Sequence, residues 1–237
     1  MKCGVGPAWG ALSDLLFPRE CVVCGGKLDV GEDSICGTCL LDVPYTRFWD
    51  WDENPAERRI WKYEGIISAA SLFFYRYEGG YASLVHQVKY GGRPELGHRL
   101  GLSLGRKMAA SGRFCSIQAV VPVPLHPLRR LRRGYNQAEK IASGIAEGLG
   151  GLPVVTGLLR RNRNTHTQTQ LSGEEKRRNV AGAFEADLES ARLLASRGIR
   201  NILVADDVMT SGATISAAVH PLMEAFRVSV ATIGFVE

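Results

Sequence analysis

The sequence contains no uninterrupted apolar run of about 18 residues, the length that a membrane-spanning helix needs, so we expect a soluble protein without a membrane span. Its first residues lack the apolar core and the small-residue cleavage site of a secretory signal, which favours a cytoplasmic location. Internal repeats and low-complexity tracts are missing, and only 22% of the residues are charged, which excludes fibrous and disordered classes. The excess of positive charge is also small, at +5 in 237 residues; it suits phosphate-bearing ligands but does not by itself indicate nucleic acid.

Four of the six cysteines form two close pairs near the N-terminus. Cys21 and Cys24 stand in CVVC, and after eleven further residues Cys36 and Cys39 stand in CGTC. Two CxxC turns complete a tetrahedral zinc site with no open position, which indicates a structural role. A redox dithiol is the alternative, but one such pair would suffice for it. Two cysteines outside the pattern are interpreted as buried or inert thiols: Cys3 and Cys115.

Residues 42–64 combine charge, aromatic residues and proline without a clear period, so we interpret them as an irregular connector. We place a domain boundary at its end. Residues 1–64 are then expected to hold a short amphipathic helix, the zinc-binding module and the connector. Residues 65–237 are expected to form the second, larger domain.

Beyond residue 65, strand-like and helix-like segments alternate. Strands are expected at Ile66–Tyr77, Ile117–Val123, Leu152–Thr156, Asn201–Ala205 and Val228–Phe235. Helices are expected at Tyr81–Lys89, Leu96–Met108, Tyr135–Leu149 and Gly212–Phe226. Such alternation predicts an α/β fold, in which helices cover a parallel sheet and ligands bind at the carboxyl ends of the strands.

The segment 202–214, ILVADDVMTSGAT, carries the clearest chemical pattern. An apolar strand is expected to end at Asp206 and Asp207, and a short turn leads into a helix. Groups from this turn can coordinate a phosphate: Thr210, Ser211, Gly212, Ala213 and Thr214. Two carboxylates would repel a phosphate, so we expect them to accept hydrogen bonds from vicinal hydroxyls or to bind Mg²⁺ through water. The pattern predicts a ribose 5-phosphate site; the alternative, an ordinary helix cap, needs only one acid and leaves the hydroxyls unused.

The same segment resembles the ligand-binding motif of type I phosphoribosyltransferases, whose ligand is 5-phosphoribosyl 1-pyrophosphate with Mg²⁺. Further motifs are similar to the ComF/GntX family of bacterial competence-related phosphoribosyltransferase-like proteins, and together they cover nearly the whole chain. They are the two CxxC pairs, VHQVKYGG (85–92), PVPLHPLRRLRRGYNQAEKIA (122–142) and the spaced pattern R-x-R-x-T-x-x-Q-x-x-L (161–171). The chain departs from the family at Ser211, where threonine is frequent, and at Ala205, where a larger aliphatic residue is usual.

The resemblance implies a type I phosphoribosyltransferase (Rossmann-like) domain with a small zinc ribbon held by four cysteines. It implies that Asp206 and Asp207 are the catalytic carboxylates and that the turn binds the sugar phosphate. Pyrophosphate would be bound by residues of a basic loop and, more weakly, by a second patch: Arg132, Arg133 and Gly134, with Lys89 and Tyr90. A solvated basic loop or a nucleic-acid contact remains the alternative for these arginines. Thr165 and Gln168 would belong to a hood over the site.

In function, the resemblance implies a protein that binds phosphoribosyl pyrophosphate, or a related ribose phosphate, with Mg²⁺ and that acts in DNA uptake during natural transformation. Pentosyl transfer would be its reaction, with an acceptor that the sequence does not identify. The alternative is a non-catalytic module that senses the ligand or binds single-stranded DNA. A weaker expectation is that the zinc module docks a helicase of the uptake machinery.

Overall fold

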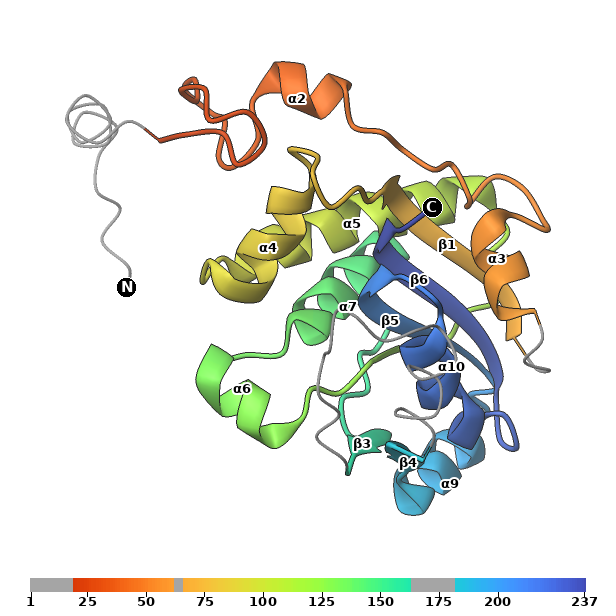
Figure 1. Ribbon diagram of the computed structural model, residues 1–237. Coiled ribbons are helices and arrows are strands. Elements are labelled where there is room, and N and C mark those ends of the chain that lie inside the picture. Colours follow the sequence, from red (N-terminus) through yellow and green to blue (C-terminus); the bar gives the residue numbers. More distant parts are fainter. Residues whose placement is uncertain (1–18, 62–65, 163–181) are drawn as a thin grey trace, which may run out of the picture.

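The computed structural model describes residues 19–61, 66–162 and 182–237 (Figure 1). The first described part holds α2 (Gly37–Leu41) and α3 (Pro55–Ile60). The other elements follow in chain order: β1 (Ile66–Phe74), α4 (Ala82–Tyr90), α5 (Pro94–Ser111), β2 (Ala119–Pro122), α6 (Pro127–Arg133), α7 (Gln137–Gly148), β3 (Leu159–Arg161), β4 (Phe184–Ala186), α9 (Leu188–Ser196), β5 (Asn201–Met209), α10 (Ala213–Val219), a 3₁₀ turn (His220–Leu222) and β6 (Arg227–Phe235). Among the described helices, none has the length and apolar character needed to cross a membrane.

A parallel sheet of four strands, in the order β1-β6-β5-β2, forms the centre of the molecule. The two inner strands, β5 and β6, are buried along almost their whole length. Continuous apolar strands of this kind are typical of parallel sheets that are covered on both faces. The predicted α/β class is therefore confirmed. Where a strand was expected at Leu152–Thr156, Val154 forms a single parallel bridge with Val120.

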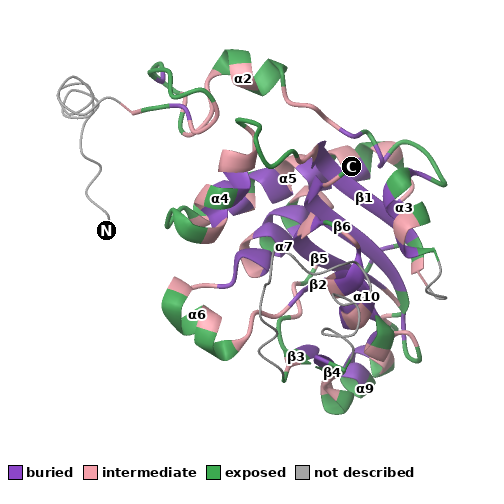
Figure 2. Ribbon diagram, in the orientation of Figure 1, coloured by how far each residue is buried: buried purple, intermediate pink, exposed green. Residues whose placement is uncertain are grey.

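Helices pack on both faces of the sheet, and each face has its own hydrophobic core (Figure 2). Leu84 of α4 and Ile141 of α7 are buried in one core together with side chains of α5. Ile60 of α3 and Ile215 of α10 are buried in the other, beside α9 and the antiparallel β3–β4 pair. The carboxyl ends of the sheet strands therefore lie between elements of both layers.

Glycines allow α5 and α7 to touch backbone to backbone. A Cβ atom on Gly101 would lie 2.2 Å from the carbonyl oxygen of Ile141, and one on Gly144 would lie 1.9 Å from that of His98. Any larger residue at these positions would push the helices apart. This close contact fixes the place of α7 against the sheet.

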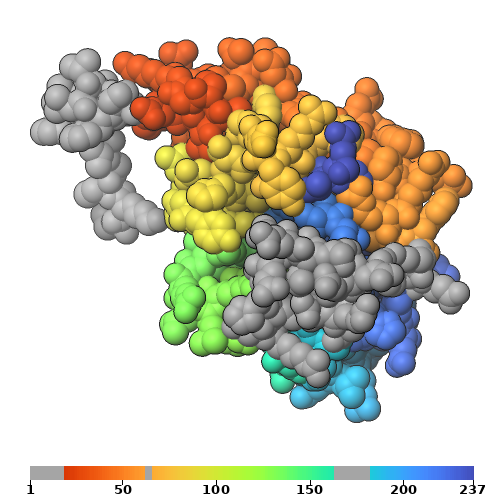
Figure 3. Space-filling model, viewed as in Figure 1, coloured from red at the N-terminus to blue at the C-terminus, as the bar shows by residue number. Residues whose placement is uncertain are grey.

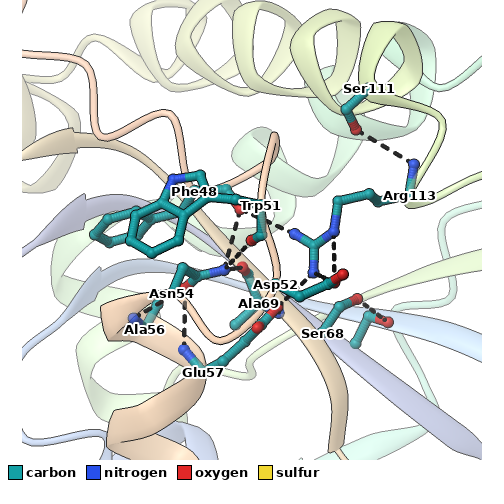
Figure 4. Close-up of polar contacts among 11 residues, drawn as sticks. Phe48, Trp51, Asp52, Asn54, Ala56, Glu57, Ser68, Ala69, Ser111 and Arg113 are labelled. Atoms are coloured by element: carbon teal, nitrogen blue, oxygen red, sulfur yellow. Dashed lines mark hydrogen bonds and ion pairs between the residues drawn. The ribbon is translucent and has the colours of Figure 1, made fainter.

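The segment expected as an irregular connector instead contains α3 and part of the core. Asn54 starts this helix: its Oδ1 accepts from the N–H groups of Ala56 and Glu57 at 3.0 and 3.1 Å, and its Nδ2 donates to three backbone carbonyls (Figure 4). Arg113 donates to Glu57 Oε1 at 2.9 Å and to the carbonyl of Phe48 at 3.0 Å. The polar and charged residues that suggested a linker therefore cap and anchor α3. This helix has six residues, which are too few to show a helical period in the sequence.

Two other expectations of local structure are wrong. The basic segment 129–133 was expected to be a loop, but it lies in α6, which Pro127 starts and which ends at Gly134 with φ at 82°. The helix expected over Gly212–Phe226 ends as an α-helix at Val219, because Pro221 in the following 3₁₀ turn cannot donate a backbone hydrogen bond.

Candidate functional site

Asp206 and Asp207, which we call the acid pair, lie near the carboxyl end of the central strand β5. This strand was expected over Asn201–Ala205 with the acid pair at its end, but it continues to Met209 because β6 pairs with it in register as far as Phe235. Both acids are therefore held by the sheet and are buried, with exposed fractions of 8% and 6%. Neighbouring side chains of a strand point to opposite faces, so the two carboxylates meet different layers of the fold.

Asp207 is held by donors from two helices of one layer. Lys89 Nζ, in the last turn of α4, lies 3.0 Å from Asp207 Oδ1. Gln137 Nε2, at the start of α7, donates to Asp207 Oδ2 at 2.9 Å. Asn136 caps α7 by accepting from a backbone N–H at 3.1 Å, and its Nδ2 donates to the carbonyl of Val123 after β2. Helix α7 is thereby tied to the neighbouring strand, and Gln137 enters the site from a fixed position.

Burial and neighbouring charges shift the pKa values of Asp206 and Lys89. Burial raises the pKa of Asp206 to about 7, and the Asp207 carboxylate adds to the rise. The Asp207 N–H, which donates to Asp206 Oδ1 at 2.9 Å, opposes the rise without offsetting it. Burial acts to lower the pKa of Lys89, but attraction to Asp207 and Asp206 outweighs it and raises this pKa.

Asp206→Asn is expected to stabilise the fold at high pH. Because the folded pKa of Asp206 is near 7 and its ordinary value is 3.8, the folded chain keeps a proton between these pH values that the unfolded chain releases. Stability of the native protein therefore falls as pH rises through this window, by up to about 4 kcal/mol. Urea unfolding should show the asparagine variant to be more stable at pH 8, by a margin that shrinks towards pH 4. A variant that is less stable than the native protein at pH 8 would contradict this assignment.

The predicted phosphate turn follows the acid pair directly. Thr210 is exposed, Ser211 and Thr214 are partly exposed, and Gly212 and Ala213 are buried at the start of α10. Gly212 has φ at +77°, and a Cβ there would also lie 3.1 Å from Ile60 of α3. Glycine is therefore required both by the backbone conformation and by the helix that packs on the turn.

Arg59 of α3 is a contact of this turn that sequence reasoning missed. Its guanidinium donates to the carbonyl of Thr210 at 2.7 Å and to that of Val236, and it lies 4.0 Å from the centre of the Phe235 ring. Burial lowers the pKa of this guanidinium. A segment N-terminal to the sheet thus braces the turn, and nothing in the spacing of the motifs indicated that contact.

The predicted pyrophosphate residues are only partly brought together. Arg133 donates to Gln137 Oε1 and lies 4.9 Å from the ring centre of Tyr90, so it joins α6 to the Asp207 contacts. Lys89 lies at the acid pair itself, whereas Arg132 and Tyr90 are exposed. Gly134 of the basic motif follows α6 and has the left-handed backbone conformation. Arg161, at the start of the expected hood segment, lies in β3, and its charge interacts with that of Asp206. The predicted hood residues Thr165 and Gln168 lie outside the described residues.

Four cysteines meet as the CxxC pairs predicted. Their Sγ atoms all lie within 4.8 Å of one another, and those of Cys24 and Cys36 are 3.8 Å apart. Tetrahedral zinc with Zn–S bonds of about 2.3 Å puts sulfur atoms about 3.8 Å apart, so the cluster fits this ion. Backbone N–H groups of Cys36 and Gly26 point at Cys21 and Cys24 Sγ at 3.3 and 3.4 Å. Burial opposes ionisation of Cys21, but hydrogen bonds from backbone N–H groups, first that of Cys36 and then those of Cys24 and Val23, lower the pKa of its thiol to about 6.

The zinc module, residues 19–41, is seated on the helix that carries Lys89. Tyr81, which precedes α4, donates its hydroxyl to the carbonyl of Cys39 at 2.8 Å. Val22, Val23 and Ile35 pack against the core that α4 shares with α5 and α7. Figure 3 shows the red module in contact with the yellow surface of α4. A charged cleft of about 570 Å³ lies between the module and the turn from α4 to α5, and Asp33 and Arg99 form an ion pair in its wall.

The acid pair does not fit a Mg²⁺ ion that it would bind directly. Magnesium needs oxygen ligands in near-octahedral order. Both oxygens of Asp207 already accept from Lys89 and Gln137, and Asp206 Oδ1 accepts from a backbone N–H. Within the described residues, the cysteine cluster is the one group of three or more ligating side chains close enough to share an ion. These side chains therefore do not support a directly bound Mg²⁺, and the Mg²⁺ expected through water stays a prediction.

Comparisons with known proteins find relatives whose names refer to competence and to DNA. Competence protein F of Haemophilus influenzae is 32% identical over 99 residues, which are 42% of this chain and 41% of that protein. DNA utilization protein YhgH of Salmonella typhi is 28% identical over 207 residues, 86% of this chain and 77% of that protein. The YhgH protein of Escherichia coli O157:H7 is 25% identical over 227 residues, which are 88% of this chain and 92% of that protein. The matched region thus spans less than half of the Haemophilus protein, and no family model matches the chain.

Proposed function

We propose that this chain, a homologue of competence protein F and of the YhgH proteins as its ComF-family motifs predicted, acts in the uptake or use of DNA. We further propose that it binds a phosphorylated pentose, with 5-phosphoribosyl 1-pyrophosphate as the expected ligand, at the acid pair and the turn behind it. The first part follows from the names of the relatives. The second depends on the geometry of the site.

One observation carries the ligand proposal: a buried acid pair on the central strand is followed at once by a glycine-containing turn into a helix. Hydroxyl groups of a sugar can donate to the carboxylates, while backbone N–H and hydroxyl groups of residues 210–214 lie one turn further along. Asp207 is held in one orientation by Lys89 and Gln137, so an acceptor for a sugar hydroxyl is already in place. This order of polar groups along the chain supports a ribose 5-phosphate as the ligand.

Positioning of the sugar is the contribution that these residues would make to a reaction. Arg133 donates to Gln137 Oε1 and belongs to a helix, α6, that carries three further arginines; guanidinium groups of this kind are suited to a diphosphate group. A diphosphate that leaves the anomeric carbon would carry negative charge towards these guanidinium groups. Release of pyrophosphate on mixing with candidate bases would identify a transferase; binding without release would identify a sensor.

Thermal unfolding with three ligands tests the proposed site. Phosphoribosyl pyrophosphate and ribose 5-phosphate should each raise Tm, whereas ribose, which lacks the phosphate, should not. At about a hundredfold excess over Kd, a ligand stabilises the folded state by about 2.7 kcal/mol, which is roughly 5–10 °C in Tm for a chain of this size. An unchanged Tm with both phosphorylated sugars would contradict the proposal.

Single-stranded DNA is the second candidate ligand, and α6 is the observation that favours it. This helix carries four arginines, has no buried residue, and exposes Leu128 and Leu131. Fluorescence anisotropy with a labelled oligonucleotide should then show an affinity that falls steeply with salt, with a slope of about 0.7 for each phosphate contacted. Arg129→Gln with Arg132→Gln should reduce that slope. Affinity that does not respond to salt would exclude this candidate.

A further inference from the structure

The acid pair lies in a site whose positive charge comes from the protein itself. Lys89 Nζ is 3.0 Å from Asp207 Oδ1, and only 26% of the lysine side chain is exposed. We propose that Lys89 is a built-in counter-ion of the acid pair, so that the chain binds a phosphorylated pentose there without a divalent cation. This inference rests on the proposed function, because it takes the pentose to be the ligand of Asp206 and Asp207.

Protein donors already contact the oxygens that a cation would use. Oδ1 and Oδ2 of Asp207 accept from Lys89 and from Gln137, the latter at 2.9 Å, and Asp206 Oδ1 accepts from the Asp207 N–H at 2.9 Å. A directly bound Mg²⁺ sits about 2.0–2.1 Å from each ligand oxygen and demands octahedral order. Such an ion would have to share an oxygen that already accepts from a protein donor, and at Asp207 Oδ1 it would lie beside the Lys89 ammonium group.

The fold holds both side-chain donors in place. Asn136 caps α7 and fixes where this helix begins, so Gln137 reaches the acid pair from a set position. Gln137 Oε1 accepts from Arg133, which leaves the amide nitrogen to face the carboxylate. Lys89 follows Val88, which is buried in the core beneath α4. An external ion would have to compete with a lysine that is anchored next to the acid.

Charges within the site balance without an ion. Lys89 offsets Asp207, and the raised pKa of Asp206 keeps this second acid partly protonated near neutral pH. A divalent cation would add two positive charges beside the partly buried ammonium group of Lys89, which like-charge repulsion disfavours. The hydroxyl groups of a pentose bring no net charge; they can donate to Asp207 and exchange hydrogen bonds with Asp206. The site is therefore built for a neutral diol next to a phosphate.

Calorimetric titration with ribose 5-phosphate tests the inference on the native, zinc-loaded protein. This probe lacks the diphosphate that would itself capture Mg²⁺. One titration uses buffer freed of divalent cations by a chelating resin, because soluble chelators would strip the cysteine cluster, and the other adds millimolar magnesium chloride. We expect Kd values that agree within about twofold. Binding that is about tenfold tighter with magnesium would overturn the inference and leave the proposed function standing. Absence of binding in both buffers would overturn the two together.

Lys89→Met adds a readout that a purely structural role would not change. Without its counter-ion the acid pair should bind ribose 5-phosphate about tenfold more weakly in the magnesium-free buffer, and magnesium should restore part of that loss. Lys140→Met, at a partly exposed lysine of α7, is the matched control and should behave as the native protein does in both buffers. A folded Lys89→Met variant with native affinity and no response to magnesium would overturn the inference. If this variant does not fold, the titrations of the native protein in the two buffers still test whether binding needs magnesium.

Discussion

Replacing Cys36 with serine is expected to release zinc and to unfold the zinc module. Structural zinc sites contribute about 10–16 kcal/mol of apparent binding energy, so one ligand in four accounts for roughly 3–4 kcal/mol, or a few hundredfold in zinc affinity. Within residues 19–41 only Cys21 and Leu28 are buried, so the module has almost no core of its own to replace the metal. Zinc content per chain should fall sharply, and limited proteolysis should cut within the module.

Cys115→Ser is the control for this experiment. Cys115 is an exposed cysteine outside the cluster, and its loss should change neither zinc content nor the proteolytic pattern. The sheet domain of the Cys36 variant should stay folded but melt earlier, because Val22, Val23 and Ile35 would leave the core around α4. The assignment of the four ligands would be contradicted by a Cys36 variant that keeps its zinc. It would also be contradicted by a Cys115 variant that loses as much zinc as the Cys36 variant.

Replacing both acids, Asp206→Asn with Asp207→Asn, is expected to abolish measurable binding of phosphoribosyl pyrophosphate. Two hydrogen bonds to charged groups contribute about 1.5–3 kcal/mol each, so the variant should bind at least about a hundredfold more weakly. Calorimetric titration against the native protein measures the difference. Equal affinity of the two proteins would remove the carboxylates from the site.

Two controls separate binding from folding in that experiment. Asp207→Asn alone leaves the partly buried Lys89 ammonium group beside a neutral side chain, so a charge-matched pair, Lys89→Met with Asp207→Asn, removes both charges together. This pair should fold and still fail to bind. Asp50→Asn removes an acid from an exposed ion pair with Arg47 and should bind as the native protein does.

The sheet and the zinc cluster could be predicted from the sequence because each depends on a local pattern. Apolar runs such as 201–205 and 228–235 become buried parallel strands, and two CxxC spacings bring four thiols together in the structure. Capping and short helices were harder to predict. Segment 42–64 looked irregular because α3 has only six residues and begins at an asparagine whose side chain bonds to distant carbonyls. Segment 129–133 looked like a loop because its helix buries no side chain and so has no apolar period.

The candidate site was predictable only where its residues adjoin a motif. Asp206 and Asp207 were selected from their own segment, whereas Gln137 and Arg59 reach the site through packing of α7 and α3. A signal for Gln137 existed: it stands within the motif 122–142, which begins at the carboxyl end of the buried strand β2. The carboxyl ends of parallel strands meet at one edge of the sheet. Arg59 had no such signal, because its contact with Thr210 joins residues 151 positions apart in the chain.

A crystal structure of the zinc-loaded chain with ribose 5-phosphate tests the central claim most directly. The phosphate should lie within hydrogen-bonding distance of backbone N–H groups of residues 211–214, with the sugar hydroxyls on the carboxylates of Asp206 and Asp207 and Lys89 still paired with Asp207. Phosphate bound instead at the arginines of α6, with the sugar away from both acids, would contradict it.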